Sequence, residues 1–160
     1  QRAMLKHLLM IALPVERRRA ALTALFEKHV GSAALWADRW YLRCGDALSM
    51  QSMGHTIGAH GYTHEPLAAL TPADQRAELQ RVAGLLNERL GAAARPVSYP
   101  YGSFDEDTMA ACREAGFAHA FTTERKWLTD NREPLRLPRV DTIFRGSRVL
   151  PSMMVYCGGQ

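Results

Sequence analysis

The sequence predicts a single globular domain of the α/β class with a largely parallel sheet, on three observations, of which the first indicates the fold class and the other two the single globular domain. Between residues 55 and 122, short apolar stretches alternate with helical patterns in the order strand, helix, strand, helix, strand. This alternation is typical of parallel strands connected by helices. The length of 160 residues suits one domain. A composition of 47% hydrophobic and 22% charged residues is ordinary for a globular protein.

The first 45 residues are predicted to be a helical segment. Residues 15–30 carry apolar side chains at helical spacing, between a proline that suits the first turn and a glycine that suits the end. A second helix is expected over residues 33–42, where Trp36 and Trp40 lie one turn apart. We interpret these two tryptophans as packing residues.

Turn and cap residues define the elements that follow. Thr71 and Pro72 are typical of a helix start, and Asp74 adds an acid to the first turn. Pro138 restricts the last strand to a sheet edge or a bulge. The expected helices cover residues 46–53, 71–90 and 105–116, and the expected strands cover residues 55–59, 97–101, 117–122 and 136–140.

In parallel sheets the working groups gather where the strands end. Three segments follow the three central strands, at residues 60–64, 101–102 and 122–123. We therefore expect these segments to converge on one rim of the sheet.

Charge and composition exclude several classes of partner. The net charge of +4 comes from basic residues that are spread along the chain, apart from a cluster at 17–19. They form no basic stripe with interleaved aromatics, so no nucleic-acid partner is expected. No apolar run is long enough for a transmembrane segment, and no signal-peptide pattern is visible. The sequence leaves the oligomeric state open.

The cysteines form no framework of metal sites or disulfides. Cys44, Cys112 and Cys157 are widely separated and odd in number. We expect them to be small buried or incidental residues. Their odd count and the lack of a signal peptide slightly favour the cytoplasm, with an exported full-length form as the alternative.

Two histidines form a candidate metal-binding pair. His60 and His64 lie in His-Gly-Tyr-Thr-His at the end of a predicted strand. In a helical or turn-like segment, positions four apart lie on the same side. Two imidazoles in this arrangement can hold one divalent metal ion. Because chance pairs are common, the spacing alone is a weak signal.

The surrounding residues make the pair more specific. Residues 54–67 resemble the metal-binding motif of the polysaccharide deacetylases (NodB-homology domain, carbohydrate esterase family 4), whose motif histidines fall on His60 and His64. Further along, Ser-Tyr-Pro-Tyr-Gly at 98–102 and Leu-Pro-Arg-Val-Asp at 137–141 resemble later blocks of the same family.

The resemblance covers roughly residues 46–145. It implies a deformed (β/α) barrel, here incomplete, in which residues 46–160 form a partial domain after the helical segment 1–45. We expect the two parts to form a single structural domain. The activity implied is hydrolysis of an N-acetyl group from a carbohydrate.

The resemblance also implies roles for named residues. A divalent metal ion, commonly zinc, would be held by His60, His64 and an aspartate, and a second aspartate would act as base on the water that the metal activates. The backbone N–H of Tyr101 would stabilise the oxyanion. Gly102 allows the tight turn that aims this amide inward. The expected contacts to the N-acetylated carbohydrate are Tyr99, Pro100 and Gly102.

The sequence departs from the family pattern at three places. Residues 1–54 contain only two aspartates, Asp38 and Asp46, and neither is carried over as metal ligand or base. No histidine follows His119 to supply the family's acid. Ser98 replaces the arginine that often precedes the Pro-Tyr turn. Two residues are expected to take the supporting catalytic role instead, Arg139 or Asp141.

Three interpretations of the chain stay open. It is a fragment of a longer deacetylase, which a start at Gln1 favours, or a degenerate, non-catalytic relative that binds carbohydrate. The third is a related C–N hydrolase that acts on a small amide. This chain alone is expected to lack the base and the acid, so its own enzymatic activity is left open.

Overall fold

The computed structural model describes residues 4–5, 9, 12–91, 95–128 and 133–140. The chain divides into two compact units, residues 1–46 and residues 47–160. Among the described residues, no helix is long and apolar enough to cross a membrane.

The first unit consists of helices joined by short turns. The two expected helices form as α2 (Val15–His29) and α3 (Ala33–Trp40). The ring of Trp40 meets that of Phe26 edge-on, with centroids 6.2 Å apart, and packs on Trp36 at 4.8 Å. The two tryptophans thus contact each other and Phe26, although Trp40 stays 58% exposed. Helix α4 (Cys44–Ser52) follows and spans the boundary between the units.

A small parallel sheet forms the centre of the second unit. Strands β1 (Pro96–Ser98) and β2 (His119–Phe121) pair in parallel. Single parallel bridges continue this pairing on both sides, from Ala59 to β1 and from Leu137 to β2. The four segments lie in the order in which they occur along the chain. The predicted α/β class and parallel direction are confirmed for this part of the chain.

Two predicted strands are wrong as regular strands, because each is reduced to one bridge. At residues 55–59, the carbonyl of Ile57 accepts a hydrogen bond from the buried Arg95 guanidinium at 3.2 Å instead of from a neighbouring strand. At residues 136–140, Pro138 has no N–H to continue the ladder. Both segments still approach the sheet in the predicted direction.

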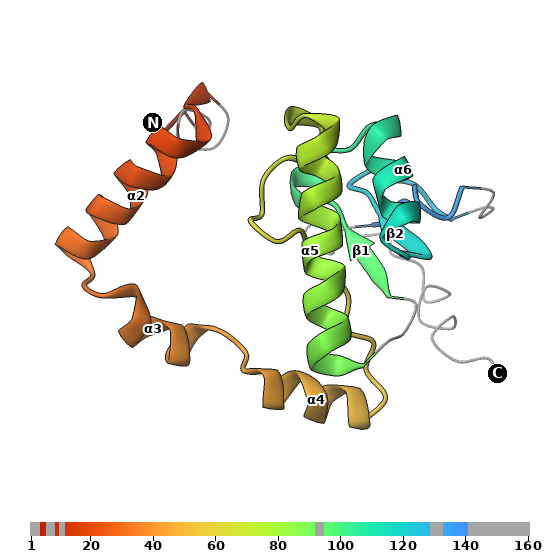
Figure 1. Cartoon of the computed structure of the whole chain (residues 1–160), viewed down its shortest axis with the longest axis horizontal. Coiled ribbons are helices and arrows are strands. Elements are labelled where there is room, and N and C mark those ends of the chain that lie inside the picture. Colours follow the sequence, from red (N-terminus) through yellow and green to blue (C-terminus); the bar gives the residue numbers. More distant parts are fainter. Residues whose placement is uncertain (1–3, 6–8, 10–11, 92–94, 129–132, 141–160) are drawn as a thin grey trace, which may run out of the picture. The chain divides into compact units, whose positions relative to one another are not determined.

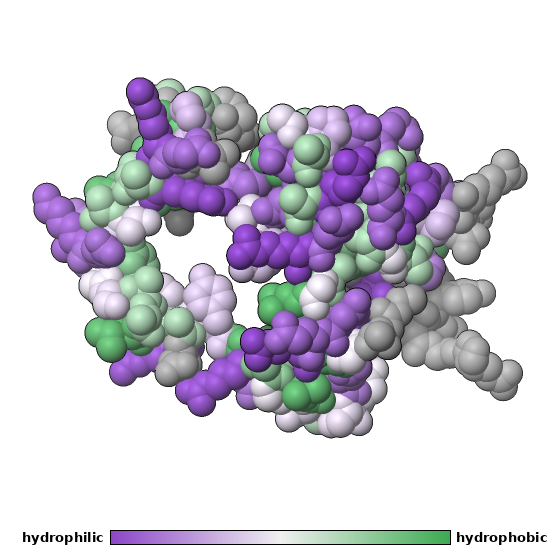
Figure 2. All heavy atoms as spheres, in the orientation of Figure 1, coloured by the Kyte–Doolittle hydropathy of each residue, from purple (hydrophilic) through white to green (hydrophobic). Residues whose placement is uncertain are grey.

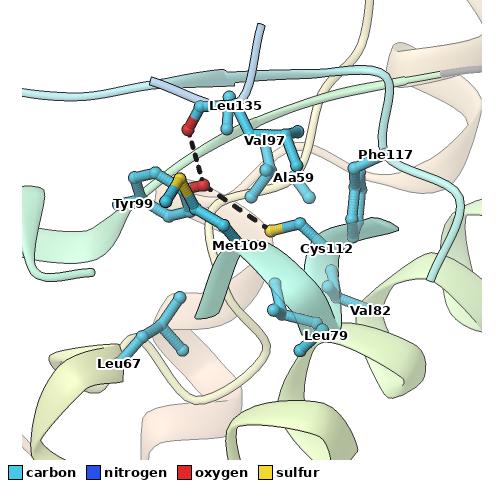
Figure 3. Packing of buried hydrophobic residues seen from close by; sticks show 12 residues of the cluster. Ala59, Leu67, Leu79, Val82, Val97, Tyr99, Met109, Cys112, Phe117 and Leu135 are labelled. Carbon is cyan, nitrogen blue, oxygen red and sulfur yellow. Dashed lines mark hydrogen bonds between the residues drawn. The ribbon is translucent and has the colours of Figure 1, made fainter. Parts of the chain in front are cut away.

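Helices α5 (Pro72–Leu90) and α6 (Glu106–Glu114) lie side by side and pack with the sheet in one core (Figures 1 and 3). Their solvent faces are largely hydrophilic (Figure 2). As predicted, the hydroxyl of Thr71 accepts from Asp74 N and caps α5. The core consists of Ala59, Leu67, Leu79, Val82, Val97, Tyr99, Met109, Ala111, Cys112, Phe117, Ala120 and Leu135.

The two cysteines that the structure describes are free thiols. Cys112 is fully buried beside the Tyr99 hydroxyl, and this burial raises the pKa of its thiol to about 11. It is therefore an unreactive packing residue, as expected. Cys44 is exposed, and Cys157 lies outside the described residues.

A buried polar network joins the first turns of α5 and α6. The Thr108 hydroxyl lies 2.5 Å from Gln75 Oε1, and both side chains are almost completely buried. Asp105 caps α6 by accepting from Thr108 N at 2.8 Å, and its other oxygen accepts from Gln75 Nε2 at 3.3 Å. Burial alone would raise the pKa of Asp105, but these hydrogen bonds outweigh it and lower the pKa below its usual value near 3.8.

Because the folded pKa is lowered, the stabilising effect of Asp105 is fully present above its unfolded pKa and is lost as pH falls through its folded pKa. We expect Asp105→Ala to lower the free energy of unfolding by about 1 kcal/mol at pH 7, with a smaller loss at pH 3, measured by urea denaturation. Asp107→Ala is the control, because it removes a neighbouring acid and leaves the cap. An equal loss at both pH values for Asp105→Ala would contradict this role.

Candidate metal centre

The ends of the parallel segments meet at one edge of the sheet, as the sequence predicts. His60 follows the first bridge, and its ring lies 4.8 Å from that of His64 between centroids. The ring of His64 lies 5.0 Å from that of Tyr101, which follows β1. Gly102 packs directly against Thr123, which follows β2. Three segments far apart in sequence therefore form one rim.

The two histidines point ring nitrogens at each other. Nε2 of His60 and Nε2 of His64 are 3.2 Å apart, and both side chains are exposed. Nδ1 of His60 lies 2.7 Å from the carbonyl oxygen of Ser98. Because a carbonyl can only accept, Nδ1 carries the proton and Nε2 keeps its lone pair. The backbone therefore fixes the orientation of the His60 ring and leaves Nε2 facing His64.

The local environment favours the neutral form of His64. Burial lowers its pKa most, the nearby His60 lowers it further, and Glu65 acts in the opposite direction. Neutral imidazole is the form that binds metal ions.

The loop between the histidines has a strained backbone. His64 has a φ of +61°, in the left-handed region that non-glycine residues rarely adopt, and Gly61 has a φ of +70°. Sequence reasoning does not single out Glu78 of α5, although its carboxylate accepts hydrogen bonds from this loop. No local pattern could have revealed this contact, because it joins positions on two different elements.

The Pro-Tyr-Gly turn forms a short 3₁₀ helix, η3 (Pro100–Gly102), at the end of β1. Tyr101 has a φ of +58° and an exposed side chain, so the turn lies on the rim beside His64. Pro100 is buried beneath the turn. The role expected for the backbone N–H of Tyr101 stays a prediction.

The structure places the Tyr99 side chain in the core, where it is 1% exposed (Figure 3). Its hydroxyl donates to the carbonyl of Leu135 at 2.8 Å, and its ring stacks on Phe104 at 4.8 Å. Burial raises the pKa of this phenol. The Tyr99 side chain is therefore a packing residue of the core. Of the three expected substrate contacts, Tyr99 and Pro100 are buried and Gly102 is partly exposed.

Arg139 lies at the rim and connects the ends of both strands. Its Nη2 donates to Ser98 Oγ at 2.9 Å, and its Nε donates to the carbonyl of Thr122 at 3.1 Å. The guanidinium thus connects the side chain of Ser98 to the backbone of Thr122. Asp141, the other predicted supporting residue, lies outside the described residues.

The histidine pair fits a tetrahedral zinc ion. Zinc binds histidine nitrogens at about 2.0–2.1 Å, so two such ligands lie roughly 3.3 Å apart. The observed Nε2–Nε2 separation of 3.2 Å is a hydrogen-bond distance between the two rings, and it is also compatible with this value. Among the described residues, no group of three or more histidine, cysteine, aspartate or glutamate side chains gathers at one point. Among the described residues, the pair therefore offers two nitrogens for a metal ion and no third ligand beside them.

Comparison with known proteins gives a consistent result. A family model described as polysaccharide deacetylase matches residues 13–120. The putative polysaccharide deacetylase YxkH of Bacillus subtilis is 31% identical over 75 residues, which are 47% of this chain and 27% of that protein. A poly-beta-1,6-N-acetyl-D-glucosamine N-deacetylase of Staphylococcus aureus is 24% identical over 89 residues, 54% of this chain and 31% of that protein. The chain thus spans about 30% of the length of these relatives.

A solved structure shares the fold. The Streptococcus pyogenes deacetylase PplD, determined in complex with acetate, aligns with a TM-score of 0.59 at 20% sequence identity. The alignment covers 62% of this chain and 44% of that one.

The close approach at the rim predicts a severe effect of Gly102→Ala. Gly102 has a φ of +68°, and an added Cβ would collide with the Thr123 side chain. Gly116→Ala is the matched control, because Gly116 has a φ of +82° but an added Cβ there meets nothing within 4 Å. We expect losses of unfolding free energy of about 1–2 kcal/mol for the control and about 1–3 kcal/mol more for Gly102→Ala. Equal losses in urea denaturation would contradict the contact.

Proposed function

This chain belongs to the polysaccharide deacetylase family, and we propose that it acts as a metal-dependent hydrolase that removes N-acetyl groups from a carbohydrate. The observation that carries the proposal is the His60–His64 pair, with its two Nε2 atoms 3.2 Å apart at the rim. The name of the S. aureus relative supports a polymer of N-acetylglucosamine as the substrate class. The incomplete deformed barrel expected from the sequence is part of this proposal.

We expect a divalent ion, zinc by preference, bound through Nε2 of His60 and Nε2 of His64. A bound zinc ion supplies a Lewis acid for the acetyl carbonyl and lowers the pKa of a water molecule. The carbonyl of Ser98 fixes the tautomer of His60, so that its lone pair faces the site. The third ligand and the catalytic base are left unassigned.

The remaining rim residues would act on the substrate. Water adds to the acetyl carbon, the C–N bond breaks, and the amine takes up a proton, which yields acetate and a free amino sugar. The backbone N–H of Tyr101 would donate to the oxyanion that forms in this addition. Arg139, anchored on Ser98 and Thr122, keeps a positive charge at the same rim.

Release of acetate tests the proposed function. The zinc-loaded protein should release acetate from β-1,6-linked N-acetylglucosamine oligomers, measured with a coupled acetate assay. His60→Ala and His64→Ala should each lower this rate by at least about 100-fold, because loss of a direct ligand should cost at least as much as loss of its hydrogen-bond partner. His55→Ala is the control, since His55 is an exposed histidine that is not one of the two motif histidines. Zinc-dependent release that survives both motif substitutions would contradict the proposed site.

A second candidate function is carbohydrate binding without turnover. It is favoured by the observation that no third metal ligand joins the pair among the described residues. Zinc-dependent binding of the same oligomers without acetate release would support it. Release from a small amide substrate, but not from the oligomers, would instead favour a related C–N hydrolase.

A further inference from the structure

We propose that Glu78 is a positioning residue that keeps the loop between His60 and His64 in its metal-binding conformation. The inference rests on the proposed function, because it concerns the same histidine pair. Glu78 lies on α5 and belongs to no motif of the sequence. Its role follows from its hydrogen bonds to the loop.

The carboxylate of Glu78 uses both of its oxygens on two consecutive loop residues. Oε2 accepts from the backbone N–H of Tyr62 at 3.0 Å and from that of Thr63 at 2.9 Å. Oε1 accepts from the hydroxyl of Thr63 at 2.7 Å. An ionised carboxylate only accepts, so it matches these three donors. Hydrogen bonds to a charged acceptor are also stronger than neutral ones.

The residues that Glu78 contacts lie between two left-handed positions of the loop, of which only His64 is strained. Gly61 precedes them with a φ of +70°, and His64 follows them with a φ of +61°. A left-handed non-glycine residue persists only when the surrounding structure determines its conformation. The hydrogen bonds to Tyr62 and Thr63 supply such a constraint at the positions next to His64.

Helix α5 provides a rigid support for this contact. Leu79, the neighbour of Glu78, is fully buried in the core, and Thr71 caps the start of the helix. Arg81, one turn after Glu78, lies over the ring of Tyr62 with its guanidinium carbon 4.0 Å from the ring centroid. Two residues on one helix therefore contact the loop. Glu78 accepts from two backbone N–H groups and one hydroxyl of the loop, and Arg81 packs on the Tyr62 ring.

This contact matters because a metal ion tolerates little variation in ligand position. Productive geometry is typically held within about 0.5 Å by the groups around the ligands. His60 is oriented by the Ser98 carbonyl at 2.7 Å. The loop bonds of Glu78 are the corresponding constraint on the second histidine, His64.

Two measurements on four proteins test the inference. Glu78→Ala and Glu78→Gln are compared with the unsubstituted chain and with Glu88→Ala, an exposed glutamate on the same helix that pairs only with its neighbour Arg89 among the described residues. The first measurement is amide hydrogen exchange of Tyr62 and Thr63 in metal-free protein. The second is zinc affinity, by competition with a chromophoric chelator at 25 °C, where circular dichroism establishes that each variant is folded.

In Glu78→Ala, the amides of Tyr62 and Thr63 should exchange faster, and zinc should bind about 10–100-fold more weakly. Glu78→Gln should be intermediate, since its amide oxygen accepts but carries no charge, and Glu88→Ala should match the unsubstituted chain. Unchanged exchange and unchanged zinc affinity in both Glu78 variants would overturn the inference. If Glu78→Ala does not fold, Glu78→Gln decides by the same two measurements.

The zinc measurement also separates this inference from the proposed function. If the unsubstituted chain fails to bind zinc, the proposed function is overturned, and the metal-positioning role with it. If both Glu78 variants bind zinc as tightly as the unsubstituted chain, only this inference is overturned.

Discussion

The candidate site depends on Ser98, because its three polar groups connect strand β1 to two other segments of the rim, one at Ala59 and His60 and the other at Arg139. Its N–H donates to the carbonyl of Ala59 at 2.9 Å, which aligns the first parallel segment with β1. Its carbonyl accepts from Nδ1 of His60 at 2.7 Å and so directs the other ring nitrogen toward His64. Its hydroxyl accepts from Arg139 at 2.9 Å. Ser98 thus connects the sheet, the candidate metal ligand and a guanidinium.

The sheet and the helices orient the two histidines by different means. The parallel pairing with β1 determines the position of His60, since His60 directly follows the bridge at Ala59. His64 lies beyond the sheet, at the end of a strained loop, and its conformation depends on the contacts that α5 makes through Glu78 and Arg81. The hydrophobic core between the helices and the sheet holds helix α5 and strand β1 together, and with them the contacts to both histidines (Figure 3).

The sequence was sufficient for features with a local cause. Thr71 as a helix cap and the order of strands and helices follow from propensity and periodicity, and the convergence at one rim follows from the parallel direction of the strands. It was insufficient where a distant side chain decides the outcome. The Arg95 guanidinium donates to a carbonyl of the expected strand at 55–59. The Tyr99 hydroxyl donates to the Leu135 carbonyl in the core. The carboxylate of Glu78 accepts from a loop residue 16 positions earlier in the chain. Such contacts leave no periodic pattern in one sequence.

The central claim is that His60 and His64 bind one metal ion through their Nε2 atoms. The most direct measurement is zinc K-edge X-ray absorption on the protein with one equivalent of zinc. The account predicts scattering from two imidazole rings with nitrogens at about 2.0–2.1 Å, and one ring fewer after His60→Ala. A spectrum without imidazole scattering, or one that His60→Ala and His64→Ala leave unchanged, would contradict it.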